Sequence, residues 1–207
     1  MEEKQLTEQE GLALIQQMIS TAKKEQKDDG RGWIIWGWML FLASVFTILN
    51  IRFHWFQVFF FWNLFGLATI LIMVYETVRD FYFRKTERVR TYTKDLFKKL
   101  NLGFFISLLF IIVSINVGVP PTFGFALLIS LYAFWILIYG TALNFRPSVI
   151  ASYITWGFGF VALAGKTFEV VMIFHALAVL CGYIIPGYIA NREFKKIHRK
   201  DKAKAGV

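Results

Sequence analysis

The sequence predicts an all-α, polytopic membrane protein, and two features of composition lead to that fold class. Apolar residues make up 57% of the 207-residue chain and charged residues only 18%, whereas a soluble domain carries roughly a quarter charged residues. The charges are also gathered at 1–31, 76–99 and 192–204, so long stretches are almost free of them. This composition excludes a soluble globule, a disordered chain and a disulfide scaffold.

Six apolar segments are long enough for a membrane span, which needs about 17 to 25 residues. They are 33–49, 55–75, 102–118, 123–143, 148–164 and 168–190. The predicted organisation is a cytoplasmic amphipathic N-terminal helix (1–31), a six-helix transmembrane domain (32–191) with a basic cytoplasmic linker (76–101), and a basic cytoplasmic tail (192–207).

The distribution of cations predicts the orientation of these spans. With six alternating spans, 21 of the 23 Lys and Arg residues fall on one side of the membrane, and only Arg52 and Lys166 fall on the other. Lys and Arg close to span ends remain on the cytoplasmic side. We therefore expect both termini to be cytoplasmic.

The linker cations are predicted to contact anionic lipid headgroups. A negative leaflet attracts juxtamembrane cations, which explains the net charge of +9 without a nucleic-acid partner, so none is expected. The linker cations are Arg79, Arg84, Lys85, Arg88, Arg90, Lys94, Lys98 and Lys99.

The N-terminal segment has the pattern of an amphipathic helix. Thr7 and Glu10 form a capping box, and the apolar residues that follow recur at helical spacing; they are Leu12, Ile15, Met18 and Ile19. Residues 1–30 contain four Lys and seven acidic residues, whereas helices that lie on anionic lipid usually carry cations. The segment is therefore expected to pack on protein, either the chain's own cytoplasmic face or a partner.

Internal similarity suggests three tandem helical hairpins with the same topology. The stretch Trp33–Trp38 recurs 120 residues later as Tyr153–Phe158, with a Trp-Gly pair in each copy, and a weaker third copy lies between them. Recurrent interfacial aromatics and glycines are the alternative explanation for this similarity.

Three sequence features carry a resemblance to a known family. They are the Trp-Gly pairs that open the first and fifth spans, the Phe145–Pro147 turn, and the Pro186-Gly187-Tyr188 motif before a basic tail. The chain resembles an uncharacterised family of small six-span bacterial inner-membrane proteins. The resemblance implies a six-helix fold in the cytoplasmic (inner) membrane. It implies no activity, cofactor or site.

Polar residues inside the spans are the clues to chemistry, because each costs free energy unless it is paired or lines a wet cavity. Asn63 and His175 lie at similar predicted depths and are the candidate cavity or ligand residues. The alternative is structural: a neutral core histidine, and an asparagine that joins neighbouring helices. Pro186 is a candidate hinge in the sixth span, and Lys166 is expected to pair with Glu169.

Three functions remain open. The preferred one is a non-enzymatic membrane module that senses or organises the bilayer. The alternative is a transporter or channel for a small solute or lipid, with a cavity near Asn63 and His175. An intramembrane enzyme is weakest, since the sequence offers no catalytic residues, cofactor motif or metal site. Composition leaves the oligomeric state undetermined.

The predicted orientation can be tested by thiol labelling in whole cells after Cys181→Ala. Cysteines placed at Val119 and Lys166 are expected to react with an impermeant reagent, whereas one at Thr91 is not, because the cation distribution places Thr91 inside. Labelling at Thr91 would contradict the orientation.

Overall fold

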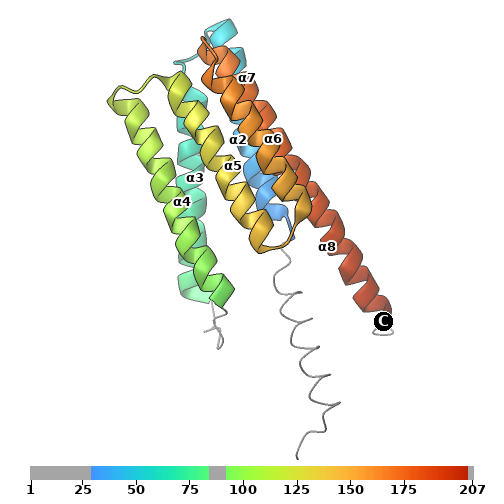
Figure 1. The fold of residues 1–207 in the computed structure, drawn as a ribbon. Coiled ribbons are helices and arrows are strands. Elements are labelled where there is room, and N and C mark those ends of the chain that lie inside the picture. Colours follow the sequence, from blue (N-terminus) through green and yellow to red (C-terminus); the bar gives the residue numbers. More distant parts are fainter. Residues whose placement is uncertain (1–28, 84–91, 205–207) are drawn as a thin grey trace, which may run out of the picture.

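The structure, a computed structural model, describes residues 29–83 and 92–204, and all regular structure in these ranges is helical (Figure 1). This confirms the predicted all-α class. The elements are α2 (Arg31–Phe53), α3 (Phe60–Phe83), α4 (Tyr92–Val117), α5 (Pro121–Ala142), α6 (Arg146–Leu163), α7 (Phe168–Val179), the π-helical segment η1 (Leu180–Ile184) and α8 (Ile185–Lys204). The last three follow one another without a break.

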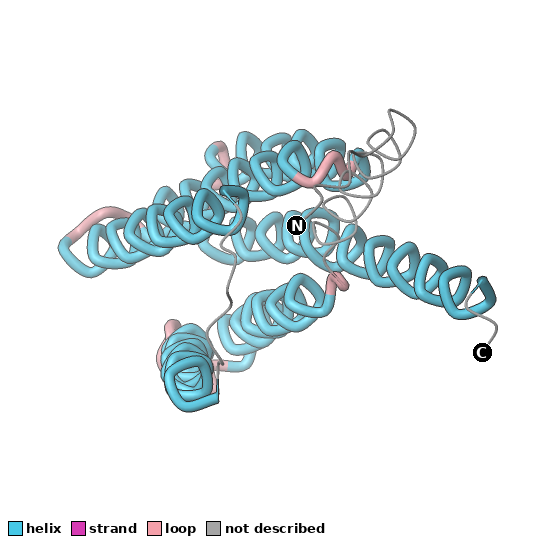
Figure 2. Tube along the Cα trace, turned by 90° about the horizontal axis from the view of Figure 1, so that it is seen from below, coloured by secondary structure: helices cyan, strands magenta, loops and turns pink. Residues whose placement is uncertain are grey.

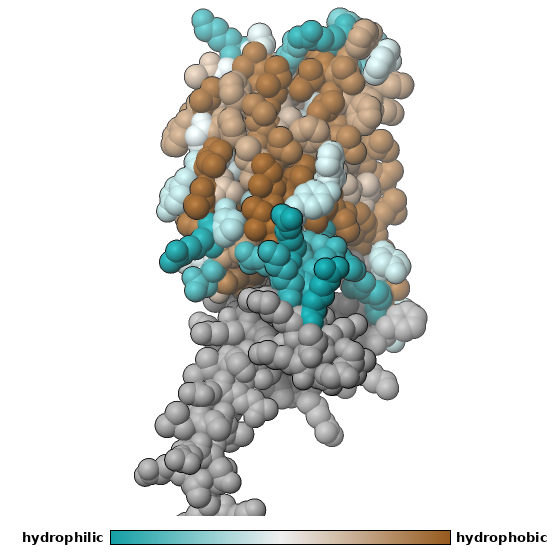
Figure 3. Space-filling view, turned by 90° about the vertical axis from the view of Figure 1, so that its right-hand side faces the viewer, coloured by the Kyte–Doolittle hydropathy of each residue, from teal (hydrophilic) through white to brown (hydrophobic). Residues whose placement is uncertain are grey.

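Four helical stretches in the described part of the chain are long and apolar enough to cross a membrane. They are Arg31–Phe53, Lys99–Val117, Pro121–Ala142 and Phe168–Lys196. In Figure 3 a broad apolar band separates hydrophilic atoms at the two ends of the molecule. These are the features of a helical membrane protein.

Two predicted boundaries differ from the structure around the second span. The prediction starts this span at Trp55, but α3 starts at Phe60, because Asn50 holds the preceding residues in a loop. The Asn50 amide donates to the carbonyls of Phe56 and Gln57 (both 3.1 Å), and its Oδ1 accepts from the Phe56 N–H (2.8 Å). At the other end α3 continues to Phe83, well into the predicted linker.

The core is formed by α2, α5, α6 and the continuous helix α7–η1–α8, which pack closely on one another. The buried face of α6 consists of small residues spaced three or four apart, which is one stripe of a helix. These are Ser148, Ala151, Ser152, Thr155, Gly159 and Ala162. Small side chains let helix backbones approach closely when no hydrophobic effect drives association within lipid.

Hydroxyl groups in this core are satisfied mainly by nearby backbone carbonyls. Thr155 donates to Ala151 O (2.8 Å), and Thr47 of α2 donates to Ala43 O (2.7 Å). These local bonds remove the cost of an unpaired polar group in a dry interior. Buried Ser and Thr residues therefore act here as small packing residues.

The π-helical segment η1 allows the last apolar helix to continue past Pro186. Proline has no N–H and its ring crowds the carbonyl four residues earlier, and here the Ile185 N–H bonds instead to Leu180 O, five residues back. The segment also presents Gly182 to α6, where an added Cβ would lie 2.7 Å from Thr155 Oγ1. The candidate hinge residue is thus buried beside a tightly packed π turn.

Helices α3 and α4 lie at the edge of the bundle (Figure 1). Backbone contacts join α3 to α2 and α4 to α5, and none joins the described parts of α3 and α4 to each other. Aromatic side chains make the α4 contact: Phe104 packs on Trp135 with ring centroids 5.1 Å apart. None of the apolar stretch of α4 is buried, and many of its apolar side chains are exposed.

The two copies of the internal repeat have different surroundings. Gly37 is buried, and a Cβ there would lie 2.8 Å from Ile184 Cγ1, whereas Gly157 is exposed with no atom within 4 Å of an added Cβ. The recurring Trp-Gly pair therefore does not mark an equivalent packing position.

Successive helices run in opposite directions, so the connections between them lie alternately at the two ends of the bundle (Figure 1). Arg52 lies in the last turn of α2, and its Nε donates to Glu169 Oε1 at the start of α7 (2.7 Å). Glu169 therefore pairs with Arg52, and the expected Lys166–Glu169 pair is wrong. At the opposite end, α8 projects beyond the other helices (Figure 1, Figure 2).

The α5–α6 turn provides a test of close packing. A Cβ on Gly140 would lie 2.9 Å from both Ser148 Cβ and the Val149 backbone nitrogen. We expect Gly140→Ala to lower the free energy of unfolding in micelles by about 1–3 kcal/mol through overpacking. The matched control, Gly157→Ala, should be neutral or stabilising by up to about 1 kcal/mol because alanine favours helix. Equal stabilities of the two variants would contradict this packing.

Candidate functional site: a buried histidine cluster

The most unusual chemical group in the core is His175, an ionisable side chain with 0% of its surface exposed. It lies seven residues into α7, about 10 Å from the helix start. Thr167 caps that start by accepting a hydrogen bond from the Val170 N–H (3.4 Å). The imidazole lies where α2, α3, α5 and α7 all contribute side chains to one cluster.

A hydrogen bond to Ser44 of α2 holds the imidazole in place. Ser44 Oγ lies 2.8 Å from His175 Nδ1 and also donates its single hydroxyl hydrogen to Leu40 O (2.8 Å). A hydroxyl that already donates to a carbonyl has only lone pairs left for the imidazole. This network assigns the proton of a neutral His175 to Nδ1 and leaves Nε2 as an acceptor.

Three aromatic rings surround the imidazole in near-perpendicular arrangements. The ring centroid of Trp62 (α3) lies 5.2 Å from that of His175, with an interplanar angle of 88°. Phe125 and Tyr132 (α5) lie at 5.8 Å and 5.6 Å. Edge-to-face packing of this kind fits the quadrupoles of the rings.

Two polar atoms in this cluster lack a hydrogen-bond partner. Among the described residues, only Trp62 Nε1 and His175 Nε2 are buried side-chain nitrogen or oxygen atoms without one. An unsatisfied buried donor or acceptor costs about 1–3 kcal/mol. Such groups are rare enough in folded proteins that each calls for a specific explanation.

His175 contacts Trp62, the residue just before its predicted partner Asn63. Asn63 is exposed on α3, whereas His175 is fully buried, so the two residues do not line one cavity. One residue is about 100° of helix, and that rotation turns Trp62 inward and Asn63 outward. Sequence reasoning missed Trp62, and it also missed Ser44, although Ser44, Thr47 and Asn50 form a polar stripe at a spacing of three.

Two of the predicted lipid-contacting cations are described with their side chains, one near the end of α3 and one on α4. Arg79 and Lys99 are exposed, and the Arg79 guanidinium lies 6.0 Å from the centre of the Tyr75 ring. Four linker cations, Arg84, Lys85, Arg88 and Arg90, lie outside the described residues, and so does the predicted N-terminal helix. Lys94 and Lys98 lie on α4, with only their backbone described.

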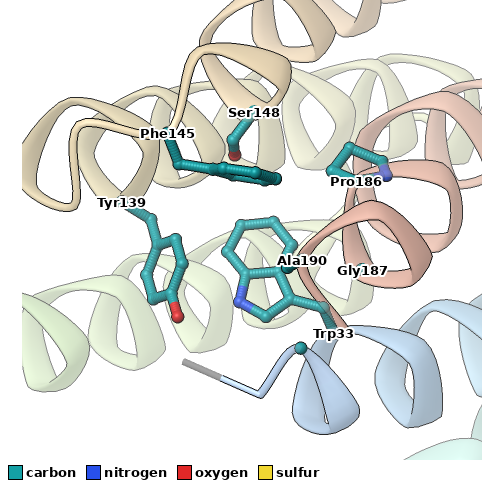
Figure 4. A pocket seen from close by; sticks show the side chains of 8 residues that line it. Trp33, Tyr139, Phe145, Ser148, Pro186, Gly187 and Ala190 are labelled. Atoms are coloured by element: carbon teal, nitrogen blue, oxygen red, sulfur yellow. The ribbon is translucent and has the colours of Figure 1, made fainter. Parts of the chain in front are cut away.

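A small apolar recess lies where the chain enters α2 (Figure 4). Its lining comes from α2, α5, α6 and α8 and from the residues just before α2 and α6. The lining residues are Gly30, Trp33, Tyr139, Phe145, Ser148, Pro186, Gly187 and Ala190. Gly30 has a φ of +70°, and a Cβ there would collide with Gly187 O, so this entry requires glycine.

The fold and these sites define a helical membrane protein with a packed polar cluster. Among the described residues no three His, Cys, Asp or Glu side chains come together as metal ligands would. Comparison with protein-family models, curated proteins and solved structures gives no match. The resemblance to the inner-membrane family thus stays an expectation, and the geometry carries the functional argument.

The Ser44–His175 hydrogen bond should contribute measurably to stability. Ser44→Ala removes the partner of His175 Nδ1, so we expect a lower melting temperature and a double-mutant coupling with His175→Phe of about 0.6–1.7 kcal/mol. The matched control is Thr47→Ala, whose hydroxyl bonds within its own helix. Its coupling to His175→Phe should be near zero, and an equal coupling would contradict the assignment.

Proposed function

We propose that this protein is a non-enzymatic, six-span module of the cytoplasmic membrane that senses or organises the bilayer. The observation that supports this role is the contrast between a closely packed core and two edge helices, α3 and α4, that have few contacts with other helices and many exposed apolar side chains. Changes in the bilayer act first on helices with few protein contacts, since those helices have the least packing energy to lose.

The remaining two spans in this proposal are α3 and α6. Helix α3 has 24 residues, about 36 Å at 1.5 Å per residue, and α6 has 18, about 27 Å; a hydrocarbon core is about 30 Å thick. The hydroxyl groups that make α6 less apolar face the protein core. Its exposed residues, such as Ile150, Ile154 and Phe160, are suited to lipid.

The proposed orientation places the starts of α2, α4 and α6 and the ends of α3, α5 and α8 in the cytoplasm. The cations of the linker and of the tail, among them the exposed Arg192, Lys195 and Lys196, then lie beside the anionic leaflet. Each such cation contributes about 1 kcal/mol of attraction to that surface.

The N-terminal segment would report the state of the core through the apolar recess. The described chain begins at Asp29, whose carbonyl accepts from Asn191 Nδ2 of α8 (2.7 Å), so the segment leaves the bundle beside the recess. The segment's net charge of −3 over residues 1–30 complements the cations of this end. The lining of the recess is mainly apolar, and the apolar face of the segment, which includes Ile15, would lie over it.

Transport is the second candidate, and the unpartnered nitrogens of Trp62 and His175 favour it. The cavity expected between Asn63 and His175 has no support in the structure, because Asn63 faces outward. The close packing of α2, α5, α6 and α7 around His175 supports the sensing role more strongly than a solute path.

Bilayer sensing predicts a distance change between the edge helices. Spin labels at Leu67 (α3) and Leu109 (α4), both exposed, should shift their distance distribution between short-chain and long-chain bilayers, since mismatch costs a fraction of a kcal/mol per Å. The control pair, Phe134 (α5) and Ile154 (α6), is exposed on two helices that pack closely on each other, so its distance should not change. Identical distributions at both positions in both bilayers would overturn the sensing proposal.

Docking of the N-terminal segment predicts a specific crosslink. In a Cys181→Ala background, Ile15→Cys should crosslink to Ala190→Cys within one chain, whereas Gln17→Cys, about 200° around the expected helix from Ile15, should crosslink less. Equal crosslinking from both positions would contradict docking of the apolar face, and crosslinked dimers would indicate a second copy as the partner.

A further inference from the structure

The two unpartnered nitrogens of the histidine cluster have complementary chemistry. The Trp62 indole N–H is a donor only, and His175 Nε2 is an acceptor once Ser44 fixes the proton on Nδ1. Both atoms are buried and lack a partner, and their rings are neighbours at 5.2 Å between centroids. One donor and one acceptor therefore remain unused in a single pair of contacting side chains.

We propose that this pair is a binding site for one hydroxyl group. The oxygen of the hydroxyl accepts from Trp62 Nε1–H, and its hydrogen is donated to His175 Nε2. The observation that points to a ligand is that two neighbouring rings each carry a buried nitrogen without a hydrogen-bond partner, although other buried polar side chains of the core have partners.

A hydroxyl group fits this site better than other polar groups. A carbonyl oxygen only accepts, and would leave His175 unsatisfied; an ammonium group only donates, and would leave Trp62 unsatisfied. The surrounding rings of Phe125 and Tyr132 provide an apolar wall with no formal charge. Such a wall favours a neutral guest, because an unpaired ion in it would be strongly penalised.

The hydroxyl group comes from one of two sources, water or an amphiphilic alcohol of the bilayer. A buried water commonly joins polar groups that lack protein partners. An amphiphile would enter beside α3, because the helix that carries Trp62 lies at the edge of the bundle. On the side of the site towards the start of α7, the surroundings are also aromatic, because the rings of Phe59 and Phe125 pack on Phe168. The site does not depend on the proposed sensing role, so the two can fail separately.

Indole and imidazole nitrogen resonances provide the test. The protein contains seven tryptophans, so nitrogen-15 labelling gives seven indole signals, and Trp62→Phe identifies one. Trp156 supplies an internal reference, because its Nε1 donates to Ser130 Oγ (3.2 Å), and Ser130→Ala shows where a membrane indole that loses its partner resonates. We expect the Trp62 signal in the wild type to resemble the bonded Trp156 signal.

Two probes distinguish the sources of the hydroxyl group. Decanol and decyl methyl ether have similar chains, but only the alcohol can donate to His175. A bonded Trp62 signal that neither probe changes identifies water. An amphiphile is identified if decanol shifts the Trp62 signal and the ether does not. This shift must also disappear when His175 is replaced.

The proposal is overturned if Trp62 resonates with the unbonded reference in the presence and absence of decanol. It is also overturned if His175 carries its proton on Nε2. Because His175→Phe can disturb folding, Ser44→Ala serves as the second variant: it removes the bond that fixes the imidazole and should move the Trp62 signal. Trp135→Phe, an aromatic change on α5 where Trp135 packs against Phe104, is the matched control and should leave the Trp62 signal unchanged.

Discussion

Polar side chains buried between the helices of this protein have no bulk water to bind, and the arrangement of the core depends on how each finds a partner. Most Ser and Thr hydroxyls of α2 and α6 donate to carbonyls of their own helices, and their small side chains keep the buried faces of these helices narrow. Those faces allow α7 to lie between α2 and α6. His175 can be fully buried there because Ser44 supplies a hydroxyl at hydrogen-bonding distance.

The same constraint explains the path of the last membrane helix. A proline inside an apolar span leaves a backbone carbonyl without its usual donor, and in lipid such a group is costly. Here Pro186 follows a π turn in which Ile185 bonds five residues back, and the neighbouring backbone is covered by close contacts with α2 and α6 at Gly37 and Gly182. The helix therefore continues to Lys204 as one element.

The edge helices follow a different rule, because they have few polar groups to satisfy within the core. Helix α3 reaches the core mainly through aromatic side chains such as Trp62, and α4 through Phe104. Lipid can cover the rest of their surfaces, so α3 and α4 need not pack on each other. This division into a packed core and lightly attached edge helices underlies both the sensing proposal and the hydroxyl site.

The amino-acid sequence by itself determined the helical class and the approximate positions of the helices, and it singled out His175 as an unusual residue in an apolar segment. These depend on local apolar runs and on the cost of one polar residue in a long apolar segment, which a sequence displays directly. Only the tertiary structure decided which side chains contact one another. It brings Trp62, in place of Asn63, to His175, and it pairs His175 with Ser44 and Glu169 with Arg52. Each of these contacts depends on how a helix is rotated about its axis and on which helices lie next to it. Because lipid and the protein interior are both apolar, hydropathy cannot tell which face of a helix turns inward.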